Sequence, residues 1–434
     1  MKEEILHVVW KYSLLNQFNC YSTDGEKIEV ISPGIHNELD AGPDFSSAKV
    51  RVGDMLWVGN VEIHVKTSDW YEHLHHFDPS YQNVVLHVVY EDDCGDIEGT
   101  KKYPIIELKK CVDLKVWNRI SQIEKSKSKI PCSDFINEVS SLDWIGWQDR
   151  LITERFERKV KEVQLIYKLS DKNWESVIFQ LLAKSLGGTV NKEPFLILSK
   201  QVNISLLNKY KDRLLVIESI LFGMSGMLDD HFIDLYPMSL KSEYSFHKAK
   251  HSLYQMESFW WKWLRLRPSS FPTIQIALLA SLIHNLKDLE LLFQVKSFSE
   301  FKEIMNENSC LSFYWENHYK FDHPSKEKTK NWGDDILKRI FINAVIPYQI
   351  AKNILSGGDE ISNFLHKMNS LKYENNKVIR KWQQLNVPIS TCYDSQAMLQ
   401  LNKEYCSRKK CLNCNIGLRI LKRSKYDGNF EENT

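Results

Sequence analysis

Two acidic residues on neighbouring predicted strands are the part of this sequence best suited to chemistry. Asp44 follows Pro43 at the start of one strand, and the next strand carries the pattern Glu62-x-His64-x-Lys66. Side chains alternate across a strand, so these last three residues share one face of the sheet. If the strands pair, Asp44 and Glu62 converge and can hold Mg²⁺ or Mn²⁺, which polarises a phosphodiester and activates water. Both carboxylates are predicted to be catalytic metal ligands, with His64 or Lys66 orienting the water.

A histidine-rich segment follows the second of these strands. Four of the 14 histidines fall between His64 and His76. Ser68 can cap a short helix over residues 69–76, and His73 and His76, three residues apart, would share a face of that helix. We predict that His73 and His76 supply further metal ligands beside the carboxylates. The alternative is a polar helix face whose histidines only contact solvent and the helix ends.

Four cysteines near the C-terminus have the spacing of metal ligands. They follow the pattern Cys-x13-Cys-x4-Cys-x2-Cys, at Cys392, Cys406, Cys411 and Cys414. Four thiolates can close a zinc tetrahedron or hold a [4Fe-4S] cluster, and the spacing leaves both open. The alternative is a set of ordinary cysteines in a helical tail. The remaining cysteines lack such spacing and are interpreted as packing residues: Cys20, Cys94, Cys111, Cys132 and Cys310.

The elements that must position the carboxylates have the order α-β-β-β-α-β. The two strands that carry Asp44 and Glu62 are joined at Gly53-Asp54, a tight-turn sequence, and therefore form a predicted hairpin. A last short strand follows Pro104. Helical periodicity and strand alternation predict helices over residues 4–15 and 69–76, and strands over residues 27–32, 45–52, 55–65, 83–90 and 105–108.

Beyond this α/β part, strand patterns give way to long helical ones. The change occurs near residue 142, after a polar stretch at residues 125–131. We predict an α+β protein with an α/β domain over residues 1–130, a helical domain over residues 131–380, and a helical tail over residues 381–434 that carries the four-cysteine metal knot.

Charge is distributed unevenly along the chain. Residues 1–110 hold 10 Lys and Arg against 19 Asp and Glu, a balance of −9, whereas residues 401–425 hold 8 against 1, a balance of +7. An acidic part suits cations and a basic tail suits phosphates. The sequence shows no signal-peptide pattern and no apolar run that could span a membrane. A cytoplasmic protein without a membrane partner is therefore expected.

The carboxylate pattern resembles the PD-(D/E)XK nuclease superfamily. The resemblance covers roughly residues 1–110 and rests on Pro43-Asp44, on Glu62 and on the element order. It implies a restriction-endonuclease-like core in which Asp44 and Glu62 bind the metal. This sequence departs from the superfamily at the third motif position, where His64 replaces the usual Lys and Lys66 lies two residues further on. A neutral His is a weaker electrostatic substitute for Lys.

Further segments look like the bacterial family called domain of unknown function 2851, over nearly the full length. This resemblance supports the domain layout and implies no activity. The segments that carry it are Gly42-Pro43-Asp44-Phe45, Gly59-Asn60-Val61-Glu62-Ile63-His64, Ser68-Asp69-Trp70, Leu86-His87-Val88-Val89, and the run from Tyr405-Cys406 to Ile416-Gly417.

Three functions are compatible with these observations. The first is a metal-dependent nuclease acting on nucleic acid, with DNA as the expected substrate, in which Asp44 and Glu62 hold the cation. The second is a catalytically inactive protein that keeps the nuclease fold and binds nucleic acid or serves as a scaffold; it predicts salt-sensitive binding without cleavage. The third is a hydrolase that uses the histidine cluster on a small phosphorylated or other substrate.

Overall fold

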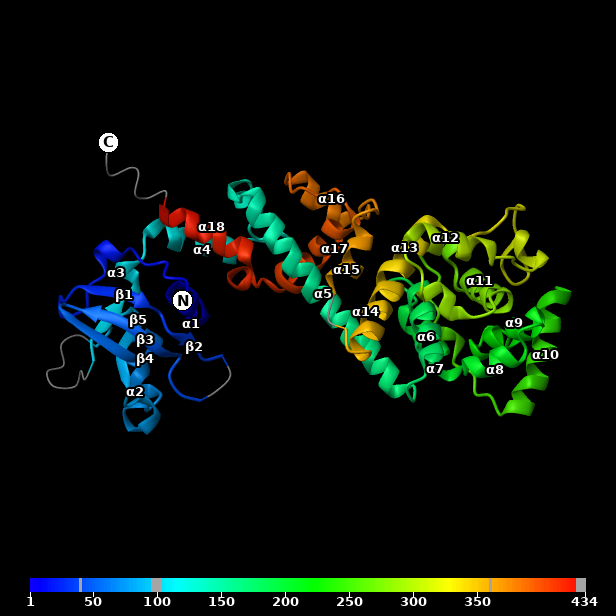
Figure 1. The fold of residues 1–434 in the computed structure, drawn as a ribbon, viewed down its shortest axis with the longest axis horizontal. Coiled ribbons are helices and arrows are strands. Elements are labelled where there is room, and N and C mark those ends of the chain that lie inside the picture. The colour runs from blue at the N-terminus through cyan, green and yellow to red at the C-terminus, as the bar shows by residue number, and fades with distance from the viewer. Residues whose placement is uncertain (39–40, 95–102, 359–360, 427–434) are drawn as a thin grey trace. The chain divides into compact units, whose positions relative to one another are not determined.

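The computed structural model describes residues 1–38, 41–94, 103–358 and 361–426. The chain forms two compact units. The first comprises Met1–Leu151, Asn375–Pro388 and Met398–Thr434, and the second comprises Ile152–Glu374 and Ile389–Ala397. The predicted α+β class is confirmed: a sheet lies near the N-terminus and helices dominate the rest (Figure 1).

A six-stranded mixed sheet forms the centre of the first unit. Its order is β1-β3-β4-β5-β6, with β2 paired to β3. The β3-β4 pair is antiparallel, as the hairpin prediction requires, while β5 runs parallel to both β4 and β6. The strands are β1 (Ile28–Ser32), β2 (Ile35–His36), β3 (Phe45–Val52), β4 (Met55–Lys66), β5 (Val84–Glu91) and β6 (Ile105–Glu107).

Local backbone features explain how the two strands of the hairpin begin and end. Gly53 has a φ of +57° in the turn between β3 and β4, a conformation that suits glycine. At the other end, the register of β3 against β4 shifts between Phe45 and Ala48, and Ser47 adopts a φ of 56°. This bulge bends the start of β3 beside β4. The residue just before β3, Asp44, is thereby turned toward β4.

Short helices pack on and around the sheet. The helix α1 (Glu3–Lys11) packs against β4, with its apolar residues buried. The helices α2 (Asp69–Glu72), α3 (Leu108–Cys111) and α4 (Leu114–Lys125) also belong to the N-terminal part of this unit. The prediction of one helix over residues 69–76 was wrong, because Leu74 adopts a left-handed conformation after α2 and a separate 3-10 turn begins at His75.

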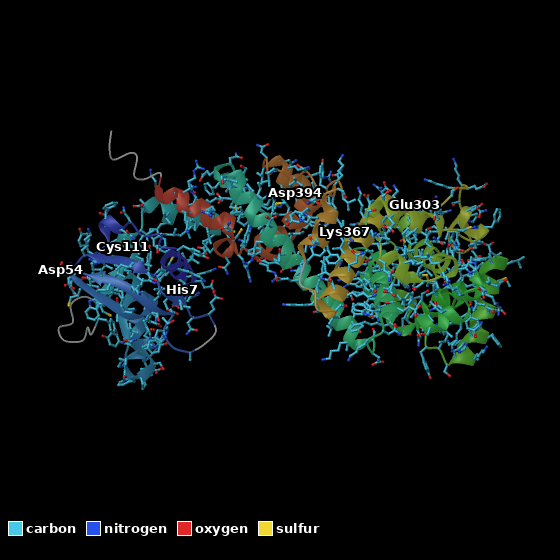
Figure 2. All side chains as sticks on the ribbon, in the orientation of Figure 1. His7, Asp54, Cys111, Glu303, Lys367 and Asp394 are labelled. Atoms are coloured by element: carbon cyan, nitrogen blue, oxygen red, sulfur yellow. The ribbon has the colours of Figure 1, made fainter. Side chains whose placement is uncertain are left out.

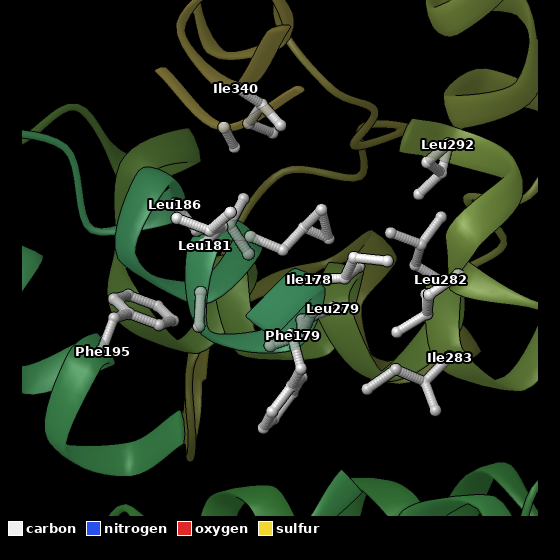
Figure 3. Packing of buried hydrophobic residues seen from close by; sticks show 14 of the residues in the cluster. Ile178, Phe179, Leu181, Leu186, Phe195, Leu279, Leu282, Ile283, Leu292 and Ile340 are labelled. Atoms are coloured by element: carbon white, nitrogen blue, oxygen red, sulfur yellow. The ribbon is translucent and has the colours of Figure 1, made fainter. Parts of the chain in front are cut away.

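The second unit is helical and has one continuous apolar core. The helices α6 and α11 supply much of it, and Figure 3 shows their side chains packed together. Residues Pro272–Ile283 of α11 are all buried, which is typical of a central helix. The helices of this unit that lie wholly within it are α6 (Trp174–Leu186), α7 (Lys192–Gln201), α8 (Ile204–Lys209), α9 (Leu214–Met224), α10 (Leu235–His251), α11 (Pro272–Asn285), α12 (Phe298–Glu307), α13 (Asp334–Ile340), α14 (Ile346–Leu355) and α15 (Ser362–Leu365).

The division between units differs from the predicted boundaries at residues 130 and 380. The helix α5 (Ser141–Leu169) continues through the boundary after Leu151, and α17 (Cys392–Gln400) through the one after Ala397. The C-terminal segment belongs to the first unit because α18 (Asn415–Tyr426) packs against α4, beside which it lies in Figure 1. The remaining helix of the first unit is α16 (Lys377–Gln384). Among the described helices, none combines the length and apolarity needed to cross a lipid bilayer.

Candidate metal centre

The carboxylates of Asp44 and Glu62 converge where β3 begins beside β4. The backbone N–H of Asp44 donates to Glu62 Oε2 at 3.0 Å. In return, the backbone N–H of Ile63 donates to Asp44 Oδ2 at 2.9 Å. Glu62 is buried and Asp44 is half-buried. Each acidic side chain is therefore held by the backbone of the other's strand, which is the convergence that the hairpin predicted.

The apolar neighbours of these residues fix that arrangement. Phe45 is fully buried and pairs with Val61 across the β3-β4 ladder. On the other side of β4, Glu62 lies opposite His87 of β5 in the parallel register. Since alternate residues of a strand point to one face, His64 follows Glu62 on the same side. The pairing and packing of the strands thus fix the direction of both the Glu62 carboxylate and the His64 imidazole.

The first helix brings two more ligand types to Asp44. His7 Nε2 lies 3.3 Å from Asp44 Oδ2, and 3.7 Å from Glu3 Oε1. These three groups bring ligand atoms within 4.8 Å of one another. His7 projects from α1, which Figure 2 shows beside the sheet. Glu3 and His7 were not predicted from the sequence, although their four-residue spacing, which places both on one face of a helix, was an available signal.

A second ligand group lies on the Glu62 side. His75 Nε2 is 3.3 Å from Glu62 Oε1, and His64 Nε2 is 3.6 Å from the same oxygen. His73 joins them through its Nδ1, 3.2 Å from His64 Nε2. The three imidazoles bring ligand nitrogens within 4.8 Å of one another. The paired carboxylates therefore lie between two groups that are each suited to a cation.

Aromatic and histidine side chains close the inner side of the histidine group. His64 Nδ1 lies 2.8 Å from His87 Nε2, and both residues are buried. His75 stacks on Tyr81 with ring centroids 3.9 Å apart, and Trp70 contacts His75 edge to face. These contacts fix the ring planes of the imidazoles. A ligand set whose side chains are fixed loses less entropy when it binds an ion.

The protonation states fit a site that receives a cation. Burial, and after it the charge of Asp44, raises the pKa of Glu62 to about 9. Burial, followed by His75 and His73, lowers the pKa of His64 to about 3. Burial also lowers the pKa of His7, but the hydrogen bond and charge of Asp44 outweigh it and raise that pKa overall. A divalent cation would relieve the repulsion between the acids and would bind the neutral imidazole of His64, and it would have to displace the proton that Asp44 favours on His7.

Two residues predicted for this site are not brought to it. Lys66 is exposed, and its Nζ lies 3.7 Å from Asp93 Oδ2. His76 is exposed and contacts Phe77, with ring centroids 3.9 Å apart. The described contacts of these two side chains include neither Asp44 nor Glu62. The break in the helix at Leu74 explains why His76 lies away from the site, because it places His75 rather than His76 toward the carboxylates.

The C-terminal cysteines gather with a different fourth partner from the one predicted. Cys406, Cys411 and Cys414 are buried in the first unit, where burial, and after it the neighbouring thiols of Cys414 and Cys411, raises the pKa of Cys132. Cys392 instead belongs to the apolar core of the second unit and is 0% exposed. Its backbone N–H donates to the carbonyl of Leu371 at 2.7 Å, which fixes the start of α17 there.

Comparison with known proteins identifies one family. A family model described as protein of unknown function (DUF2851) matches residues 3–377, which confirms the resemblance noted from the sequence. The matched range contains both candidate ligand groups and Cys132, and it ends before Cys406. No curated protein and no solved structure matches the chain.

Proposed function

Because the chain belongs to the DUF2851 family, whose description states no activity, we propose from the site itself that it is a metal-dependent nuclease. Its substrate would be the phosphodiester backbone of nucleic acid, with DNA as the first candidate. One observation carries the proposal: Asp44 and Glu62 converge from adjacent strands, each accepting a hydrogen bond from the backbone beside the other. Carboxylates in this arrangement are suited to sharing a divalent cation.

The donor set indicates which cation fits. Asp44 and Glu62 offer hard oxygen ligands, which suit Mg²⁺ and Mn²⁺. His7 lies within 3.3 Å of one carboxylate and His75 within 3.3 Å of the other, and imidazole ligands favour Mn²⁺ over Mg²⁺. When bound, the cation would polarise the phosphoryl oxygen and lower the pKa of a water molecule. We therefore expect stronger activity with Mn²⁺.

The histidines differ in the roles that they could have in catalysis. His64 occupies the position where the nuclease superfamily usually has Lys, but it is buried and paired with His87. A buried imidazole lacks the permanent charge that Lys supplies. His75 is only half-buried and contacts Glu62, so it is better placed to orient or accept a proton from water. Lys66, paired with Asp93, has no role in this scheme.

A basic segment in the same unit supports nucleic acid as the substrate. Arg408, Lys409, Lys410, Arg419 and Arg423 are exposed and belong to the C-terminal part of the first unit. Exposed Lys and Arg residues bind phosphates in a salt-dependent way. The acidic candidate ligands and this basic segment therefore belong to one compact unit, whereas the boundaries predicted from the sequence separate them.

The test is cleavage of labelled single- and double-stranded DNA and RNA with Mg²⁺ or Mn²⁺. Asp44→Asn and Glu62→Gln are expected to abolish cleavage while the far-UV circular dichroism stays unchanged. Asp54→Asn is the matched control, because Asp54 is an exposed carboxylate at the opposite end of the same hairpin (Figure 2), and it should retain full activity.

The other outcomes separate the alternatives. Salt-sensitive binding of nucleic acid without cleavage under either metal would reject the nuclease and favour an inactive member of the fold. That alternative has a specific observation in its favour, since the usual Lys position holds the buried His64. Hydrolysis of small phosphorylated compounds, with no effect on nucleic acid, would instead identify a small-molecule hydrolase.

A further inference from the structure

Four buried cysteines of the first unit lie in one neighbourhood, although Cys132 is far from the other three in sequence. Cys132 precedes the 3-10 helix Ser133–Glu138, which packs against α18, while the other three lie just before α18. Burial, and after it the neighbouring thiols of Cys414, Cys132 and Cys411, raises the pKa of the Cys406 thiol. Each of the four is at most 8% exposed. Packing of α18 thus brings Cys132 to the C-terminal cysteines.

Several N–H groups point to the sulfur of Cys414. Burial raises the pKa of the Cys414 thiol, and the backbone N–H groups of Gly417 and Ile416 oppose that rise as donors to the sulfur. The turn is so tight that a Cβ on Gly417 would lie 2.1 Å from the carbonyl oxygen of Cys411. Only glycine allows this approach. A neutral thiol accepts hydrogen bonds weakly, so such an arrangement suits a thiolate better.

The indole of Trp147 gives an independent indication. Its side chain is 9% exposed, and its N–H makes no hydrogen bond of ordinary geometry within the described residues. It nevertheless lies close enough to the Cys414 sulfur to act on it as a donor. A buried N–H without a full hydrogen bond costs about 1–3 kcal/mol. A thiolate at Cys414 would provide the missing acceptor.

The separation of the sulfurs discriminates between metal centres. With Zn–S bonds of about 2.3 Å, a tetrahedral zinc site sets its four sulfurs about 3.8 Å apart. In the described part of the chain, two groups bring three ligand atoms within 4.8 Å of one another, and neither contains a cysteine. No three of the described cysteine thiols lie within that limit of one another. An iron-sulfur cluster is larger than a single ion and holds its cysteine ligands further apart than one zinc ion does.

We propose that Cys132, Cys406, Cys411 and Cys414 are the ligands of an iron-sulfur cluster. The cluster ties the basic C-terminal segment to the first unit. Cys392, assigned as the first ligand from spacing alone, has no part in it. This proposal is independent of the nuclease chemistry, since none of its residues contacts the carboxylate site among the described contacts.

The experiment is analysis of iron, sulfide and zinc, with the visible absorption spectrum, of the full-length protein purified without oxygen. We expect about two to four iron atoms per chain with matching sulfide. Cys132→Ser should lose the iron and the visible absorption, and Cys392→Ser, the matched control, should keep both. Stoichiometric zinc without sulfide, a metal-free protein, or loss of iron in Cys392→Ser alone would overturn the proposal.

If Cys132→Ser does not fold, a less disruptive substitution can still test the proposed ligands. Trp147→Phe removes the N–H donor and leaves all four thiols in place. Hydrogen bonds to cluster sulfurs influence the reduction potential. Trp147→Phe should therefore keep its iron but show a lower reduction potential than the parent protein. An unchanged potential would contradict the placement of a cluster sulfur at Cys414.

Discussion

The buried acid Glu218 predicts a measurable pH dependence in the helical unit. It lies on α9, is 1% exposed, and accepts a hydrogen bond from Ser312 at 3.2 Å. Burial raises its pKa from 4.5 to about 7, against the opposing hydrogen bonds from Tyr236 and Ser312. Between these pH values the folded chain retains a proton that the unfolded chain has released. The free energy of unfolding therefore falls as the pH rises through this window and is level above it.

The size of the effect follows from the same values. The difference between 4.5 and 7, at about 1.36 kcal/mol per pKa unit, amounts to roughly 3 kcal/mol of lost stability at neutral pH. Glu218→Gln is uncharged and retains an acceptor for Ser312 and Tyr236. It is expected to remove this pH dependence and to stabilise the unit by about 2 kcal/mol at pH 8, after a cost for its additional N–H donor.

The assay is hydrogen exchange of α9 peptides across the pH range, corrected for intrinsic exchange, because it reports on this unit alone. Glu303→Gln is the control, since Glu303 is an exposed carboxylate on α12 (Figure 2). The control should follow the parent protein at every pH. If Glu218→Gln kept the parent's pH dependence, or were less stable than the parent at pH 8, the electrostatic reasoning would be refuted.

Two further predictions concern the first unit. Phe45→Ala should lower the free energy of unfolding, measured by urea denaturation, by about 3–5 kcal/mol, because the Phe45 side chain is 0% exposed. Phe18→Ala is the control and should change the free energy of unfolding little, because the Phe18 side chain is 76% exposed. Equal effects of the two substitutions would contradict the described packing. His75→Ala should weaken Mn²⁺ binding, measured by calorimetric titration, at least about tenfold, whereas His76→Ala should leave the affinity unchanged. A larger loss of affinity in His76→Ala than in His75→Ala would contradict the site geometry.

The β3-β4 hairpin and its acids were predictable because the relevant signals are local. Alternation places Glu62 and His64 on one face, and the turn at Gly53 defines the pairing. The candidate ligands on α1 were not predicted, since the approach of Glu3 and His7 to Asp44 depends on how a helix packs on a sheet. That packing depends on contacts between residues distant in sequence, and a single sequence does not reveal them.

The structure also differs from the sequence-based prediction at His76 and at Cys392, and each difference has a specific cause. A helical pattern over residues 69–76 favoured His76, but the left-handed conformation of Leu74 turned the following residues and brought His75 to Glu62 instead. For the cysteines, regular spacing favoured Cys392, whereas the structure places Cys132 with the C-terminal group. Only the packing of α18 against α4 and the segment after Cys132 reveals that neighbour.

The most direct test of the account is a titration of the chelator-treated protein with Mn²⁺, followed by electron paramagnetic resonance. The account predicts a saturable site in the parent protein and in Asp54→Asn, with loss of that site in both Asp44→Asn and Glu62→Gln. Binding that survives unchanged in the last two variants would show that the paired carboxylates do not hold the cation, and the proposed catalytic centre would have to be abandoned.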